Sequence, residues 1–225
     1  EIVSRDWSSD VCSSDLWALA AVTLVLGSVM AVVQTNVKRM LAFSSVSHAG
    51  FMLVGVEAAA HVAGRAEAGN GSSVLMYTLV YAVLVSGTFG VVTAVSRTGD
   101  GATGLSAFRG LGRSNPVLAL GMTVLLLAQA GVPLTSGFVA KFGVIGSAVD
   151  RHSYAIALIA MVSAVIAAFL YLRILISMWI ADPEAADAGR EAVVVPGLLR
   201  VAIALSVGFT LLIGFFPNWL IAITP

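Results

Sequence analysis

The sequence predicts an all-α membrane protein with six transmembrane helices, one of which is discontinuous. Of its 225 residues, 59 % are hydrophobic and only 11 % are charged, and the mean hydropathy is +0.98. This composition is typical of polytopic helical membrane proteins. The formal net charge is zero, so nothing indicates nucleic-acid binding. The single cysteine, Cys12, excludes an intramolecular disulfide and any multi-cysteine metal or iron–sulfur site.

The discontinuous helix is expected in the stretch 115–150. As one straight helix this stretch would be about 50 Å long, against a hydrocarbon core of about 30 Å. Gly131 and Pro133 mark the expected break, because the proline nitrogen cannot donate a hydrogen bond to the carbonyl of Gln129. Broken backbone at membrane depth is tolerated only inside protein or beside a wet cavity. The break is therefore expected to lie at a buried site.

Lys141 is the one charged residue between the start of this stretch and Asp150 at its end. An ammonium group at membrane depth is costly in lipid, so its presence indicates a functional site. The alternative is a proline-kinked helix whose lysine snorkels to the surface. Snorkelling is disfavoured because Lys141 lies roughly 13 Å along the helix axis from Asp150.

Apolar segments place the six helices in chain order. The expected ranges are 17–33, 37–56, 74–95, 116–149 with a break near 131–133, 153–180 and 198–216. Thr35 or Asn36 is a candidate N-cap of the second helix. Lysine and arginine residues gather in the loops after the first, third and fifth helices. The positive-inside rule then places these loops in the cytoplasm and both ends of this chain on the outer side.

Residues 1–16 differ from the rest of the chain. They are polar, they repeat Ser-Ser-Asp at 8–10 and 13–15, and they run abruptly into an apolar helix at Trp17. The segment resembles translated sequencing-adapter read-through. We therefore expect 1–16 to be non-native and disordered, with 17–225 as the transmembrane domain and more of the protein upstream. A genuine polar N-terminal tail is the alternative.

Polar side chains of the second helix share one face at a spacing of three or four residues: Ser44, Ser47 and His48. His48 lies near mid-depth, and an imidazole both donates and accepts protons near neutral pH, which suits a relay. The alternative is a structural histidine satisfied by a neighbouring hydroxyl. Ser44 and Ser47 also suit helix packing.

Tyr81 of the third helix either extends a hydrogen-bonded chain or packs against neighbouring helices. We expect His48 and Lys141 to point into the bundle beside these groups.

Three further polar residues lie in or beside the helices. Gln129, one turn before Pro133, is placed to bond the loosened backbone. Arg173 lies near the end of its helix and is expected to snorkel, and Glu57 is expected to be solvated. The sequence contains no His-Glu-x-x-His or Cys-x-x-Cys motif and no nucleotide-binding glycine pattern. Metal-assisted catalysis and nucleotide binding are therefore unsupported.

Three motifs carry a resemblance to a known family. They are RGLGRSNP at 109–116, QTNVKRMLAFSSVSHAGF at 34–51 and AGVPLTSGFVAKF at 130–142. Together they resemble the antiporter-like membrane subunits of complex I, the proton-pumping NADH:quinone oxidoreductase. The resemblance covers residues 17 to about 219 and corresponds to the C-terminal six of roughly fourteen helices.

The resemblance implies a fold and roles for individual residues. The family is built from two inverted five-helix repeats, so this chain is expected to hold the second repeat and a closing helix. Lys141 matches the family's terminal lysine and His48 its central histidine, which together form a proton relay. Tyr81 falls where some relatives carry a second histidine. The family's first-repeat glutamate and two central lysines are absent because this chain starts too late.

The resemblance also implies cofactors, partners and location. No cofactor is expected in this chain, because FMN, the iron–sulfur clusters and quinone belong to other subunits. The expected partners are the M-type and K-type neighbouring subunits and the lipid bilayer of the cell inner (plasma) membrane. Two alternatives stay open. One is a subunit of a multi-subunit cation/proton antiporter or membrane-bound hydrogenase. The other is an inert scaffold bundle, which would tolerate leucine or methionine at Lys141.

Overall fold

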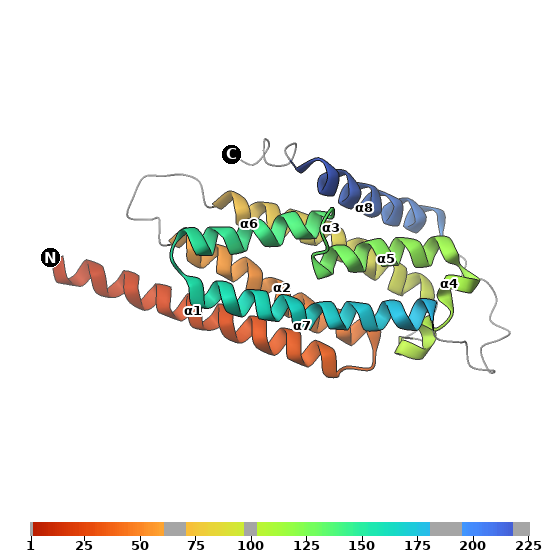
Figure 1. Cartoon of the computed structure of the whole chain (residues 1–225), viewed down its shortest axis with the longest axis horizontal. Helices are drawn as coiled ribbons and strands as arrows, with labels where there is room; N and C mark the ends of the chain where they lie inside the picture. The colour runs from red at the N-terminus through yellow and green to blue at the C-terminus, as the bar shows by residue number, and fades with distance from the viewer. Residues whose placement is uncertain (1, 61–70, 97–102, 181–194, 218–225) are drawn as a thin grey trace.

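The computed structural model describes residues 2–60, 71–96, 103–180 and 195–217, which form a bundle of α-helices lying along one direction (Figure 1). The elements are α1 Ile2–Val33, α2 Val37–Ala60, α3 Gly71–Ser96, η2 Leu105–Phe108, α4 Leu111–Ser114, α5 Pro116–Ala130, α6 Ser136–Asp150, α7 Tyr154–Trp179 and α8 Gly197–Phe215. Within the described residues, five helices are long and apolar enough to cross a membrane. The shorter α5 and α6 together supply the sixth span. The predicted all-α fold with one discontinuous helix is confirmed.

The start of α1 differs from the sequence-based expectation. Residues 1–16 were expected to be disordered, but α1 begins at Ile2 and continues without interruption to Val33. Its first residues contain neither glycine nor proline, so nothing in the backbone stops the helix from extending beyond its apolar part. Figure 1 shows this end of α1 projecting past the other helices. That residues 1–16 are non-native stays a prediction.

Small residues bring α1 and α2 into close contact. A Cβ atom added at Gly27 would lie 2.4 Å from the backbone nitrogen of Ser47, and one added at Gly50 would lie 2.9 Å from that of Leu24. Such small residues let two membrane helices approach until their backbones touch. Ser47 is therefore part of the α1–α2 contact, and its buried Oγ has no hydrogen-bond partner among the residues that the structure describes.

Backbone hydrogen bonds join two loops at one end of the bundle, which we call the basic end because it carries Lys38, Arg39, Arg109 and Arg113. Asn36 and Gly104 form an isolated antiparallel bridge. Asn36 also donates from Nδ2 to Thr103 Oγ1 at 2.8 Å. Its Oδ1 accepts from the amide of Arg39 at 3.3 Å. Of the two candidate N-caps of α2, the structure therefore selects Asn36.

We expected Arg173 of α7 to snorkel toward the surface. It bonds the end of α1 instead. Its Nη1 donates to the carbonyl oxygens of Val32 at 3.0 Å and Gln34 at 3.1 Å. The last carbonyls of a helix have no partner within that helix, and a cation is favoured there by the helix dipole. Arg173 therefore fastens the C-terminal end of α1 to α7.

Arg173→Leu is expected to lower the free energy of unfolding by about 1–3 kcal/mol, because it leaves these carbonyls without their charged donor. The measurement is thermal unfolding of the full-length protein in detergent. Arg200→Leu is the control, since Arg200 is exposed and contacts the Val195 carbonyl at 3.4 Å. Equal melting temperatures for the two variants would contradict a capping role for Arg173.

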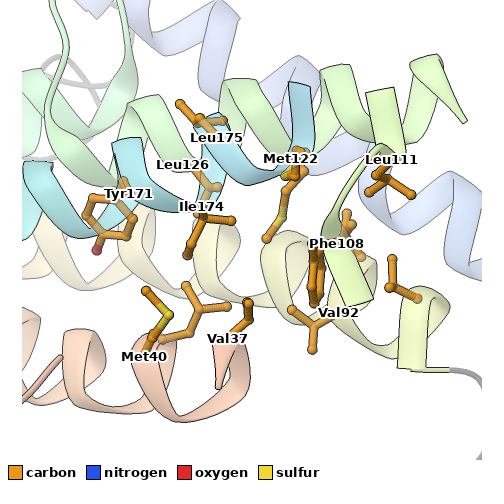
Figure 2. Close-up of a cluster of buried hydrophobic side chains, with 14 of the residues drawn as sticks. Val37, Met40, Val92, Phe108, Leu111, Met122, Leu126, Tyr171, Ile174 and Leu175 are labelled. Atoms are coloured by element: carbon orange, nitrogen blue, oxygen red, sulfur yellow. The ribbon is translucent and has the colours of Figure 1, made fainter. Parts of the chain in front are cut away.

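The apolar core consists of two clusters along the bundle. One lies near the basic end and includes Met40, Phe108, Met122 and Ile174, with Tyr171 at its edge (Figure 2). The other is formed by further buried residues of α1–α3 and α5–α8, among them Leu24, Phe51, Tyr77, Leu84, Leu125, Val144 and Ile156. Ser44 and His48 of α2 lie between the residues that α2 contributes to these two clusters, and both are buried.

Candidate functional site

Defined caps close both sides of the helix break. Gly131 adopts a left-handed conformation with φ 88°, and its amide donates to the carbonyl of Leu127 at 3.1 Å. Thr135 caps α6, because its Oγ1 accepts from the amide of Phe138 at 3.4 Å. Leu134 also has a positive φ of 68°, which a bulky residue rarely adopts. The break falls where Pro133 led us to expect it.

Lys141 supplies the hydrogen bonds that the break removes. It is 6 % exposed, and its Nζ lies 2.8 Å from the carbonyl oxygen of Gln129 and 3.0 Å from that of Ala130. In an unbroken helix these carbonyls would accept from residues 133 and 134. Pro133 has no N–H, and Leu134 lies outside the helix. Lys141 therefore caps the C-terminal end of α5.

The direction of α6 explains why a residue in its second turn reaches the break. Helical side chains tilt toward the N-terminus of their own helix, so the Lys141 chain points back along α6. Its Cδ would lie 3.0 Å from a Cβ atom added at Gly131, so a larger residue there would have to displace the lysine chain. The ring of Phe51 lies beside the ammonium, with its centroid 5.3 Å from Nζ. The charge is thus held by two carbonyls and an aromatic face.

We expected the side chain of Gln129 to hydrogen-bond the loosened backbone, but it does not. It turns toward α3, where its Nε2 donates to Thr88 Oγ1 at 2.5 Å. Lys141 bonds the loosened backbone instead, at the carbonyl of Gln129. Both Gln129 and Thr88 are buried, so this contact fixes the end of α5 against α3.

His48 is hydrogen-bonded to hydroxyl groups from two other helices. It is 4 % exposed. Its Nδ1 lies 2.8 Å from the hydroxyl of Tyr77 on α3, and its Nε2 lies 3.0 Å from the hydroxyl of Tyr171 on α7. The Tyr171 hydroxyl is also hydrogen-bonded to Ser44 Oγ, which lies one turn before His48 on α2. A continuous hydrogen-bonded chain therefore joins Tyr77, His48, Tyr171 and Ser44.

One small cavity connects His48 and Lys141. Its lining comes from α2, α3 and α6 and comprises His48, Tyr77, Val80, Tyr81, Leu84, Gly137, Ala140 and Lys141. Its volume is about 10 Å³, which is close to the minimum for one water molecule. The Tyr81 ring stacks on His48 with centroids 4.4 Å apart. Both predicted site residues are thus buried and face the same space, with Tyr81 beside them, as expected from the sequence.

The two serines expected to support the site have different surroundings. Ser44 belongs to the hydrogen-bonded chain through Tyr171. Ser47 lies at the contact with Gly27 of α1 and is not among the residues that line the cavity. The structure therefore brings Ser44 to His48, whereas Ser47 lies in a helix contact.

Glu57 near the end of α2 is buried, although we expected it to be solvated. It is 1 % exposed, and its Oε1 accepts from the hydroxyl of Ser153 at 3.1 Å. Ser153 directly precedes α7, and its contact with Glu57 brings this turn over the carboxylate. The expectation failed because this cover comes from a turn about one hundred residues further along the chain.

Sequence reasoning missed Tyr171. It lies in the apolar segment YLRILI, where Arg173 was the conspicuous residue, and its contact to His48 spans 123 positions of the chain. Tyr77 was not among the predicted site residues either. Across the described ranges, no group of three or more histidine, cysteine or acidic residues could hold a metal ion.

The fold and the site together define a class of protein. It is a multi-pass α-helical membrane protein in which a buried lysine, at the break of a discontinuous helix, shares a cavity with a buried histidine. The chain belongs to the NADH:quinone oxidoreductase/Mrp antiporter transmembrane family, whose family model matches residues 3–167.

Two relatives show how much of a full-length protein is present. The chain is 42 % identical over 204 residues to NADH-quinone oxidoreductase subunit N 3 of Streptomyces griseus, a match covering 91 % of this chain and 35 % of the relative. It is 43 % identical over 204 residues to NADH-quinone oxidoreductase subunit N of Rhodococcus opacus, covering 90 % of this chain and 36 % of the relative. The chain thus spans little more than a third of the length of these relatives.

A solved structure of respiratory complex I from Thermus thermophilus with bound aureothin contains a similar fold. The similarity has a TM-score of 0.77 with 26 % sequence identity, and it covers 91 % of this chain and 44 % of the matched chain. The predicted family and the predicted architecture are therefore confirmed.

Proposed function

We propose that this chain is the C-terminal part of subunit N of a proton-pumping NADH:quinone oxidoreductase, in which Lys141 and His48 carry protons. The observation that carries the proposal is their convergence on one cavity inside an apolar bundle. Ionisable side chains are rare at membrane depth and mark ion paths when they face a bundle interior. The identity to proteins named subunit N supports the choice of complex.

The geometry supports a proton step between Lys141 and the histidine chain. Lys141, His48 and Tyr77 line a cavity with room for about one water molecule. A water there accepts a proton from Nζ and passes one of its own to the tyrosine or the imidazole. No heavy-atom bond changes, and the two carbonyls that hold Lys141 remain in place.

The proposal includes the surroundings of the subunit. The basic end faces the cytoplasm of a cell whose inner (plasma) membrane holds the complex, so both ends of this chain lie on the outer side. M-type and K-type subunits flank it. This chain holds no cofactor; FMN, iron–sulfur clusters and quinone are bound by other subunits, where the redox chemistry occurs.

A second candidate function is proton transport in a multi-subunit cation/proton antiporter, because the matching family model covers Mrp antiporters as well. The Lys141–His48 site would carry protons in either assembly. A full-length protein that exchanges sodium for protons without NADH and quinone would identify the antiporter.

Replacing His48 by Phe tests the proposal in the full-length subunit, assembled in its complex and reconstituted in vesicles. Phenylalanine keeps a ring against Tyr81 but carries no proton. Positioned proton-transfer groups contribute about 10²- to 10⁴-fold to rate, so we expect proton translocation through this subunit to fall at least tenfold. The measurement is the ratio of protons moved to NADH oxidised. An unchanged ratio in the assembled variant would contradict the proposal.

His152→Phe is the matched control. His152 is exposed in the turn before α7, and its Nδ1 contacts only the Tyr154 hydroxyl, at 2.9 Å, among the contacts described here. Its replacement is expected to leave the ratio unchanged. A loss in both variants would point to a general effect of removing a histidine from the subunit.

A further inference from the structure

We propose that Tyr171 and Tyr77 carry protons to and from His48, so that the chain Tyr77–His48–Tyr171–Ser44 is a relay with two interconvertible hydrogen-bonding directions. The proposal rests on the proposed function and adds two relay residues to it. Its basis is geometric: both imidazole nitrogens have a tyrosine hydroxyl within hydrogen-bond distance, at 2.8 and 3.0 Å.

The hydrogen-bonding inventory of the four groups allows only two consistent directions. A neutral imidazole donates from one nitrogen and accepts at the other, and each hydroxyl donates once. In one direction, Ser44 donates to Tyr171, Tyr171 donates to Nε2 of His48, and Nδ1 donates to Tyr77. In the other direction every bond is reversed. The structure gives the positions of the heavy atoms, and the same positions fit both directions of hydrogen bonding.

Moving one proton along the chain converts one direction into the other. A proton arriving at the Tyr77 oxygen displaces the hydroxyl proton of Tyr77 to Nδ1 of His48. Nε2 then releases its proton to Tyr171, whose own hydroxyl proton passes to Ser44. Each of the four groups gains one proton and loses one, and Ser44 passes its own hydroxyl proton to a water molecule beyond the end of the chain. No heavy-atom bond forms or breaks.

The surroundings of the ring favour this relay. Tyr81 stacks on His48 with an angle of 21° between the ring planes. This stacking holds the plane of the ring, so that both imidazole nitrogens stay directed at the two tyrosine hydroxyls. Tyr77 lines the cavity shared with Lys141, so the chain begins where a proton from Lys141 arrives.

The far end of the chain lies toward the basic end of the bundle. Ser44 precedes His48 by four residues on α2, which begins at that end. The rise of 1.5 Å per residue places Ser44 about 6 Å nearer to the basic end than His48. Tyr171 also borders the apolar cluster of Figure 2, which includes Met40 and Ile174. The relay thus leads from the middle of the membrane to the border of this cluster.

Tyr171→Phe tests the proposal, because it removes one oxygen and keeps the ring in the apolar cluster. We expect at least a tenfold loss of proton translocation in the assembled full-length complex, with its melting temperature within a few degrees of the wild type. The matched control is Tyr154→Phe on the same helix, where the hydroxyl contacts only exposed His152 among the contacts described here. It is expected to pump at the wild-type ratio.

The single variant Ser44→Ala and the double variant Ser44→Ala/Tyr171→Phe make the test specific. If Ser44 and Tyr171 act in one chain, the double variant is no worse than the worse of the two single variants. Additive losses, or wild-type pumping in Tyr171→Phe, would overturn the relay. If Tyr171→Phe fails to assemble, Tyr77→Phe and Ser44→Ala decide in its place, and wild-type pumping in both would overturn it. If His48→Phe loses proton translocation while the tyrosine and serine variants pump fully, the relay is rejected and the proposed function stands. If His48→Phe also pumps fully, the proposed function is rejected as well.

Discussion

Replacing Lys141 by Ala is expected to reduce proton translocation through this subunit at least tenfold, which lowers the ratio of protons moved to NADH oxidised by the share that this subunit contributes. The variant loses the one ammonium beside the cavity and leaves the carbonyls of Gln129 and Ala130 without their donor. Each unsatisfied buried carbonyl costs about 1–3 kcal/mol, so we also expect a lower melting temperature. Assembly must therefore be measured along with pumping.

Two other substitutions at Lys141 separate the explanations. Lys141→Met preserves much of the volume and is tolerated if the bundle is an inert scaffold, but we expect it to pump as poorly as the alanine variant. Lys141→Glu is expected to retain some activity, because a protonated carboxyl donates to one of the two carbonyls and can release its proton. Full pumping in the methionine variant would make Lys141 a structural residue.

Replacing Gly137 by Ala is expected to cause the largest structural disturbance. The added Cβ would lie 1.8 Å from the carbonyl oxygen of Ala128, so α6 has to move away from the end of α5. Overpacking costs about 1–3 kcal/mol even where side chains can yield, and here the obstacle is backbone. Gly137 also lines the cavity, so displacement of α6 draws Lys141 away from its carbonyls. We expect reduced assembly together with reduced pumping.

The control for Gly137 lies on the same helix. A Cβ added at Gly143 meets nothing within 4 Å. Alanine is favoured over glycine inside a helix by about 0.5–1 kcal/mol, so Gly143→Ala is expected to be neutral or slightly stabilising. Thermal unfolding of both full-length variants in detergent makes the comparison. A melting temperature for Gly137→Ala equal to that of Gly143→Ala would show that the α5–α6 contact is looser than described.

Much of the fold could be predicted from the sequence because its determinants are local. Pro133 removes a backbone donor wherever it lies in a helix, so the break followed from one residue. Apolar runs predicted the ends of the spans to within a few residues except at the start of α1, which begins at Ile2 rather than Trp17, and Asn36 was among the two candidate caps. The burial of Lys141 and His48 followed from the cost of exposing polar groups to hydrocarbon.

The partners of these residues could not be predicted, since they depend on packing between distant segments. Tyr171 approaches His48 from a helix 123 positions away, and Ser153 covers Glu57 from 96 positions away. Near Lys141 the sequence offers no acidic residue before Asp150 that could compensate its charge. Lys141 bonds two carbonyls that become available only because the same helix is broken.

Lys141→Arg is the variant that tests the central claim most directly, because it separates the capping of α5 from the transfer of a proton. A guanidinium donates to the carbonyls of Gln129 and Ala130, so the cation that caps α5 is retained, yet it effectively never releases its proton. The measurement is the ratio of protons moved to NADH oxidised, in complexes assembled at wild-type amounts. We predict a ratio as low as that of Lys141→Ala with a melting temperature closer to the wild type. A wild-type ratio in the arginine variant would contradict the claim that Lys141 carries protons.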